Sequence, residues 1–143
     1  MKTIINASLQ LSATNFSGKE IEIEGTCPAL RDLVALTFGS LGLAKRIKKS
    51  EIMLHIHCMM NNSMLIIITR PGEVVVEVDE STTRVSGSFE NMNLIFEVIS
   101  QFIEDGNEAE CKGEHIHIEY INESSLVSQG SCGLIVSKSS VGF

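Results

Sequence analysis

The sequence lacks the features that would mark a secreted, disulfide-stabilised or membrane-spanning protein. It contains no tryptophan, one tyrosine, two prolines and four cysteines among 143 residues. The cysteines are irregularly spaced and form no Cys-x-x-Cys pair, which predicts free thiols in a reducing compartment. No apolar run is typical of a signal peptide or approaches the roughly 20 residues that cross a bilayer. We therefore expect a cytoplasmic protein with no membrane partner.

Signatures of catalysis and of nucleic-acid binding are also missing. The sequence has no Gly-x-Ser-x-Gly, no His-Glu-x-x-His, no Walker phosphate loop and no dinucleotide fingerprint. Four basic residues gather at positions 45–49, but no aromatic residue or glycine-rich loop accompanies them, so a solvated helix end is favoured there. We predict that the protein is not an enzyme, carries no cofactor and binds no nucleic acid.

Positive charge is scarce in the second half of the chain. Residues 1–71 hold eight Lys/Arg and five Asp/Glu, a net charge of +3. Residues 72–143 hold three Lys/Arg and thirteen Asp/Glu, a net charge of −10. This asymmetry predicts an acidic surface that attracts basic partners; the alternative is that the acidic residues serve solubility.

Hydrophobic patterning predicts one domain over residues 1–143 that begins with strands and a helix. Residues 2–12 alternate loosely and residues 20–24 strictly, with Ile21 and Ile23 on one face and three carboxylates on the other. Residues 15–19 are typical of the turn between antiparallel strands. A helix should begin at Thr26 and Pro28 and be ended or interrupted by Gly39 or Gly42. Its predicted buried stripe is Leu30, Leu33, Val34 and Phe38.

The remaining pattern predicts further strands and a second helix. Residues 52–60, 64–69 and 73–79 indicate an antiparallel meander with 64–68 at the centre of the sheet, and 82–86 indicates an additional strand. Strands are also expected at 113–121 and 134–137. The second helix should be capped by Ser88 or Asn91, end before Gly106 and bury a stripe formed by Leu94, Ile95, Val98, Ile99 and Phe102. This predicts an α+β fold, an antiparallel β-sheet of about six to eight strands with two α-helices packed on it.

All four histidines occur in two His-x-His pairs, His55/His57 and His115/His117. Because strand side chains alternate, each pair shares one face of its strand, and Glu119 joins the second pair. Imidazoles two residues apart are about 7 Å from each other, so a shared metal ion needs a further ligand from a neighbouring strand. Cys58 lies on the opposite face from its pair and is a poor ligand. We predict no metal site and interpret the second pair as part of a binding face.

Carboxylates concentrate next to that second pair. Residues 104–110 form an acidic loop whose spacing does not match an EF-hand. Carboxylates can imitate nucleic-acid phosphates and so attract a basic partner. The predicted partner-binding residues are Glu104, Asp105, Glu108, Glu110, Glu114, His115, His117 and Glu119.

Three segments resemble small immunity proteins of bacterial polymorphic-toxin and contact-dependent growth inhibition systems. They are Ile21-Glu22-Ile23-Glu24-Gly25 with the following Leu30-Arg31-Asp32-Leu33, then His115-Ile116-His117-Ile118-Glu119-Tyr120, then Ser124 to Leu126 with Leu134-Ile135-Val136. The resemblance implies a cytoplasmic, non-enzymatic protein that binds and blocks the C-terminal domain of a cognate toxin. Two alternatives remain open: a metal-binding protein or metal-dependent enzyme that uses the His-x-His strands, and a structural module that self-assembles through an edge strand such as 82–86.

Overall fold

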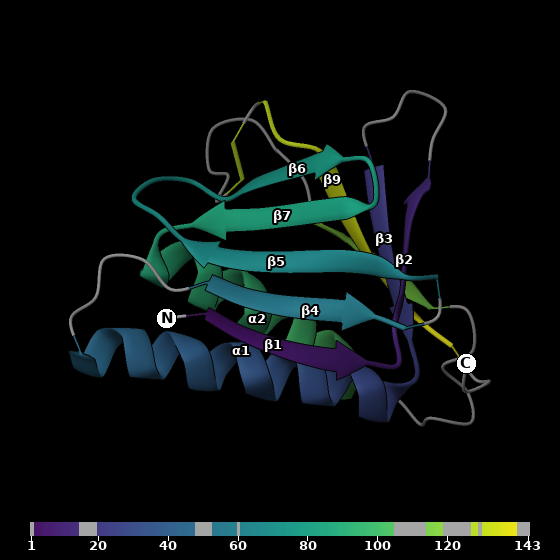
Figure 1. The fold of residues 1–143 in the computed structure, drawn as a ribbon, viewed down its shortest axis with the longest axis horizontal. Coiled ribbons are helices and arrows are strands. Elements are labelled where there is room, and N and C mark those ends of the chain that lie inside the picture. The colour runs from purple at the N-terminus through teal and green to yellow at the C-terminus, as the bar shows by residue number, and fades with distance from the viewer. Residues whose placement is uncertain are drawn as a thin grey trace.

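The computed structural model describes residues 2–14, 20–47, 53–59, 61–104, 114–118, 127–128 and 130–139. Two mixed sheets and two helices make up this part of the chain (Figure 1). The elements are β1 (Lys2–Ala7), β2 (Gln10–Thr14), β3 (Glu20–Gly25), α1 (Cys27–Ile47), β4 (Met53–Cys58), β5 (Ser63–Thr69), β6 (Val75–Asp79), β7 (Thr82–Gly87), α2 (Phe89–Glu104), β8 (His115–Ile118) and β9 (Gly133–Lys138). The five-stranded sheet has the order β1-β4-β5-β7-β6, and the four-stranded sheet has the order β2-β3-β9-β8.

The predicted α+β class is confirmed, whereas a purely antiparallel sheet is wrong. Three pairings are parallel: β1 with β4, β5 with β7, and β3 with β9. The four-stranded sheet lies behind the five-stranded sheet in Figure 1, and its strands run steeply across those in front. The sequence pattern identifies strands from local signals, but parallel pairing joins segments that are distant in the chain and carries no turn signature of its own.

The predicted meander is correct for its first two strands only. β4 and β5 pair antiparallel, and β5 is central as expected. The next strand beside β5 is β7, and β6 lies outside it at the edge. β7 is mostly buried, whereas β6 exposes its last three residues. The greater burial of β7 favours an inner position in the sheet, and the charged strand β6 lies at the edge. The edge role considered for 82–86 in self-assembly is therefore wrong.

The predicted N-terminal strand is divided between the two sheets. β1 belongs to the five-stranded sheet and β2 to the four-stranded sheet, with fully buried Leu9 at the change of direction. The expected antiparallel pairing of β2 with β3 is confirmed, although the turn predicted at 15–19 lies outside the described residues. Burying Leu9 requires the chain to turn into the core at this point, which loose alternation does not reveal.

Helix α1 begins where the sequence predicts and ends later. The Ala29 N–H donates to Thr26 Oγ1 at 3.3 Å, which confirms Thr26 as the cap. Leu30, Leu33 and Val34 are buried, and Phe38 is half-buried. The helix continues without a break through Gly39 and Gly42 to Ile47, so the predicted end or interruption at these glycines is wrong. A glycine inside a helix costs only about 1 kcal/mol, which the long buried face of this helix offsets.

Helix α2 is rotated relative to the predicted stripe. Ser88 caps it, because its Oγ accepts a hydrogen bond from the Asn91 N–H at 3.2 Å. Ile95, Ile99 and Phe102 are buried as predicted, but Leu94 and Val98 are 44% and 51% exposed. Met92, Phe96 and Ile103 take their places because α2 contacts α1, β7 and β8 on that side. The apolar residues surround more of the helix than one stripe, and only tertiary contacts select among them.

One apolar core joins both sheets and both helices. Its members include Leu11 and Ile23 from the four-stranded sheet, Leu65 and Val85 from the five-stranded sheet, and Leu30 from α1. Because side chains alternate along each strand, the residues between the buried ones face away from this core. Two parts of the surface are of functional interest: the side of the four-stranded sheet that faces away from the core, and the edge of the five-stranded sheet at β1.

Candidate protein-binding face

The outer side of the four-stranded sheet gathers carboxylates and imidazoles from two distant parts of the chain. Along β3, Ile21 and Ile23 are buried, which turns Glu20, Glu22 and Glu24 outward. Across the sheet, β9 pairs with both β3 and β8. His115 and His117 are exposed on β8, and they share the outer side with the glutamates. We call Glu20, Glu22, Glu24, His115 and His117 the acidic–histidine face.

The pairing register aligns these side chains in rows. Glu22 pairs with Ile135, which pairs with His117. Glu24 pairs with Ser137, which pairs with His115. His117 Nδ1 lies 3.9 Å from Glu20 Oε2, and the two histidine rings are 5.1 Å apart between centroids. Ser137 Oγ donates to Glu22 Oε2 at 2.5 Å, which fixes the middle carboxylate of the row.

The electrostatics of this face favour binding of a cationic group. Partial burial raises the pKa of Glu24, and the neighbouring charge of Glu22 raises it further. By strand alternation, the described residues of the outer side also include Gln10, Ser12 and Gly133 but no lysine or arginine. Ser137 donates a hydrogen bond to Glu22, and a cation supplied by a partner would stabilise the ionised carboxylates of this face further.

The predicted partner-binding residues do not all lie together. His115 and His117 are on the acidic–histidine face. Glu114 instead reaches toward the core side, where its Oε2 lies 3.8 Å from Nζ of Lys138. That lysine is 2% exposed and its Nζ lies 4.4 Å from the centroid of the Phe102 ring, so Glu114 neutralises a buried cation.

Glu104 belongs to the helices. Its Oε1 accepts a hydrogen bond from Nε of Arg31 at 2.9 Å, which links the end of α2 to α1. This exposed ion pair satisfies its charge, so Glu104 is a weaker candidate for partner binding than the glutamates of β3. Four of the predicted residues lie outside the described part of the chain: Asp105, Glu108, Glu110 and Glu119.

Sequence reasoning did not assign the three glutamates of β3 to the site. Their strict alternation with isoleucine was visible and correctly predicted a strand with a carboxylate side. What was missing was the position of β9, which brings residues 20–24 beside residues 115–117. The acidic–histidine face therefore draws its carboxylates from the half of the chain with a net positive charge.

The two His-x-His pairs do not meet. β4 belongs to the five-stranded sheet and β8 to the four-stranded sheet. The ring of His57 is held between two amides, with Nδ1 3.1 Å from Asn6 Oδ1 and Nε2 2.8 Å from Asn62 Oδ1. Within the described ranges, no group of three or more His, Cys, Asp or Glu residues is placed to hold a metal ion.

The thiols follow the sequence expectation where they are described. Cys27, Cys58 and Cys132 are free, and Cys111 lies outside the described residues. Cys58 is fully buried on the opposite face of β4 from His57, as alternation predicts. Burial raises the pKa of Cys58 to about 11, against a smaller opposing effect of its hydrogen bond with Ser63. Such a thiol is unsuited to act as a nucleophile at neutral pH.

The fold and this face define an α+β protein of two mixed sheets, one of which carries carboxylates and imidazoles on its outer side. No family model matches the chain, and no curated protein or solved structure matches it significantly. Neither helix, over the residues described, combines the length and apolar character needed to cross a membrane.

Proposed function

We propose that this protein is an immunity protein that binds and neutralises a cognate bacterial toxin domain. The acidic–histidine face is its main contact surface, and the toxin is a basic, nuclease-type domain. The observation that supports this most is the row of Glu20, Glu22 and Glu24 beside His115 and His117, on a sheet surface whose described residues include no cation.

The geometry of the row suits imitation of a phosphate backbone. Alternate residues of a strand repeat about every 7 Å, so the three carboxylates extend over roughly 13 Å in a nearly straight line. A nuclease must hold a line of phosphates with lysines and arginines. A rigid sheet that presents carboxylates to those same side chains attracts the toxin over a distance and then occupies its substrate site.

The two histidines add hydrogen bonding to the charge. Each imidazole can donate through one ring nitrogen and accept through the other. Because β8 is the last strand of its sheet among the described residues, both rings lie at the margin of the carboxylate row, where a docked protein would pass. The protein would act without cofactor or metal, in the cytoplasm of the cell that makes the toxin, by blocking access to it.

The test compares two triple charge reversals that change the net charge equally. Glu20→Lys/Glu22→Lys/Glu24→Lys alters the acidic–histidine face, and Glu73→Lys/Glu77→Lys/Glu80→Lys alters exposed positions around β6 as the control. The probe is the protein encoded by the reading frame immediately upstream of the gene. We expect the first variant to bind at least about 100-fold more weakly, since each lost charged contact removes roughly 1–2 kcal/mol. The control should lose less than about threefold.

Two results would contradict the proposal. Equal losses in the two variants would show that net charge matters and the face does not. Absence of binding by the wild-type protein, together with no protection of growth when the upstream protein is expressed, would remove the immunity function. Circular dichroism of both variants establishes that each has kept its fold.

A further inference from the structure

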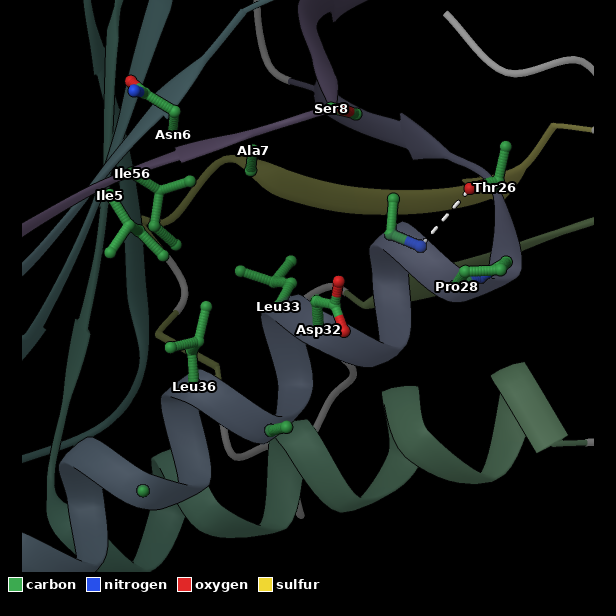
Figure 2. Close-up of a pocket in the computed structure, with 13 residues that line it drawn as sticks. Ile5, Asn6, Ala7, Ser8, Thr26, Pro28, Asp32, Leu33, Leu36 and Ile56 are labelled. Carbon is green, nitrogen blue, oxygen red and sulfur yellow. Dashed lines mark hydrogen bonds between the residues drawn. The ribbon is translucent and has the colours of Figure 1, made fainter.

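A groove separates the edge strand β1 from helix α1. Its volume is about 890 Å³, near the upper end of the range of ligand-binding pockets. Figure 2 shows side chains of the sheet on one side and of α1 on the other. The apolar residues that matter most to the groove are Ile5, Ala7, Ile56, Leu33 and Leu36.

The groove has a buried floor and an exposed apolar wall. Ile56 and Leu33 are 0% and 2% exposed, so they seal the bottom against the core. Leu36 is 40% exposed, although it is a large apolar side chain on a helix whose other leucines are mostly buried. Water beside Leu36 is displaced favourably by any apolar group that enters. Asp32 is exposed and is the one charged residue among the described groove residues.

The main chain of β1 is open along this groove. In the five-stranded sheet β1 pairs only with β4, and the Ala7 carbonyl accepts a hydrogen bond from the Met59 N–H at 3.0 Å. Main-chain groups of alternate residues point to opposite edges of a strand. Ile4 and Asn6 therefore direct their N–H and C=O groups away from β4, toward the open edge. Among the described residues no second strand pairs there.

We propose that this groove receives an extended segment of a partner polypeptide, which adds to β1 as a further strand. Its alternate apolar side chains would contact Ile5, Ala7 and Leu36, and a lysine or arginine would lie beside Asp32. A polypeptide fits because it can satisfy hydrogen-bonding groups that repeat along an edge while it fills an apolar channel beside them. The charge of Asp32 selects a cationic residue in an otherwise apolar segment.

This site is independent of the acidic–histidine face. The groove belongs to the five-stranded sheet and α1, whereas the acidic–histidine face belongs to β3 and β8. None of the residues changed in the test of the immunity function contributes to the groove. Failure of one proposal therefore leaves the other standing.

The decisive variants are Asn6→Pro and its matched control Asn6→Ala. Proline removes the N–H that points to the open edge, and it spares the pairing with β4, which uses Ile5 and Ala7. Both substitutions remove the side-chain contact with His57, so any general effect of that loss appears in both. Asn6→Pro should bind an added strand at least about fivefold more weakly than Asn6→Ala, as expected for one lost main-chain hydrogen bond and a steric block.

The probe is a panel of synthetic peptides slightly longer than β1, in which Val alternates with Thr and one Lys is moved through the sequence. A control panel has the same composition with the Val residues in one block. Binding to the full chain is followed by amide chemical shifts. We expect the alternating peptides to shift amides of β1 and of the first half of α1, and the block peptides to shift them much less.

The Asp32 contact has its own control. A peptide with Glu in place of Lys should bind the wild-type protein more weakly and should regain affinity with Asp32→Lys. Any of four results would overturn the proposal. These are no shifts at β1 up to millimolar peptide, shifts centred elsewhere, equal binding by Asn6→Pro and Asn6→Ala, and self-association without peptide that Asn6→Pro abolishes. The last result would make a second copy of the chain the occupant.

Discussion

The two His-x-His strands place the same motif in different surroundings. On β4, the strand partners of His55 and His57 are Ile66 and Met64 on one side and Ile4 and Asn6 on the other, all uncharged. His57 is tied to two asparagines. On β8, His115 and His117 are exposed and share their side of the sheet with three glutamates. The motif is local, but the chemistry available to it is decided by which strands pair beside it.

His57 therefore links neighbouring segments of the fold, whereas His115 and His117 are exposed. Asn6 and Asn62 come from β1 and from the turn between β4 and β5, so His57 joins three segments. His117 makes a long contact with Glu20 and an edge contact with the His115 ring, and its side chain is otherwise exposed. Four experiments test this contrast.

The largest effect is expected on the buried side of β4, opposite His57. With the pKa of Cys58 at about 11, only roughly 0.1% of this thiol is ionised at pH 8, against about a quarter of a free cysteine with a pKa near 8.5. Maleimide labelling of native protein, read by mass spectrometry, should be at least about 100-fold slower at Cys58 than in guanidinium. Equal rates in the two conditions would mean that β4 opens readily and does not form a rigid support for His57.

A smaller effect is expected on stability. His57→Ala should lower the free energy of unfolding by about 1–2 kcal/mol, because it removes two hydrogen bonds that join neighbouring segments. His117→Ala should change it by less than about 0.5 kcal/mol, as for an exposed surface contact. Urea unfolding followed by circular dichroism measures both. If the two variants lose the same stability, the structural distinction between the pairs is wrong.

Partner binding should show the opposite order. The double variant His115→Ala/His117→Ala should bind the upstream-encoded protein roughly three- to tenfold more weakly, since each imidazole supplies about one hydrogen bond. His55→Ala, on the other sheet, is the control and should keep wild-type affinity. If titration calorimetry shows weaker binding for His55→Ala than for the double variant, the binding role belongs to the five-stranded sheet.

The smallest effect concerns Glu24 and depends on pH. Its raised pKa means that the folded state holds the proton more tightly than the unfolded state. Glu24 therefore contributes its full stabilisation below about pH 4.5, where its carboxyl is protonated. This contribution is lost as the pH rises through the folded-state pKa. Glu24→Gln should raise the thermal midpoint at pH 7 by at most about 3 °C, the scale of a screened surface interaction.

The control for that experiment is pH itself. At pH 3, well below the ordinary pKa of 4.5, the glutamine variant and the wild-type protein should unfold at nearly the same temperature, because the wild-type carboxyl is neutral in both the folded and the unfolded state. A gain that persists at pH 3 would attribute the effect to packing, and a loss at pH 7 would mean that the ionised carboxylate is stabilised in the folded protein.

Much of the fold could be predicted because local chemistry specifies it. Asn61-Asn62-Ser63 marked the connection between β4 and β5, and Asn62 adopts a φ of 53°, a conformation that asparagine tolerates better than most residues. Thr26 and Ser88 marked the starts of both helices. The end of α1 could not be predicted, since Gly39 and Gly42 stop a helix only when tertiary contacts do not sustain it.

The candidate site was half predictable for a similar reason. Alternation correctly assigned faces to Cys58 and Ile118, and it identified the glutamates of β3 as one side of a strand. It could not show that β9 pairs with both β3 and β8, because strands far apart in the chain carry no local sign of their pairing. Nor could it show that β1 lies at an edge beside α1, since strand order is a property of the whole sheet.

The position of β9 between β3 and β8 has a consequence for synthesis. Ser137 and Glu22, which hydrogen-bond across this pairing, are 115 positions apart in the chain. A ribosome that has made everything up to β8 has still not supplied the strand that joins β3 to β8. The entropic cost of closing so long a loop is offset only by the contacts of residues 133–138, which are synthesised last among these strands. We therefore expect this sheet to assemble late. A product that stops before Gly133 would retain both His-x-His motifs and all three glutamates, and would not bring them together.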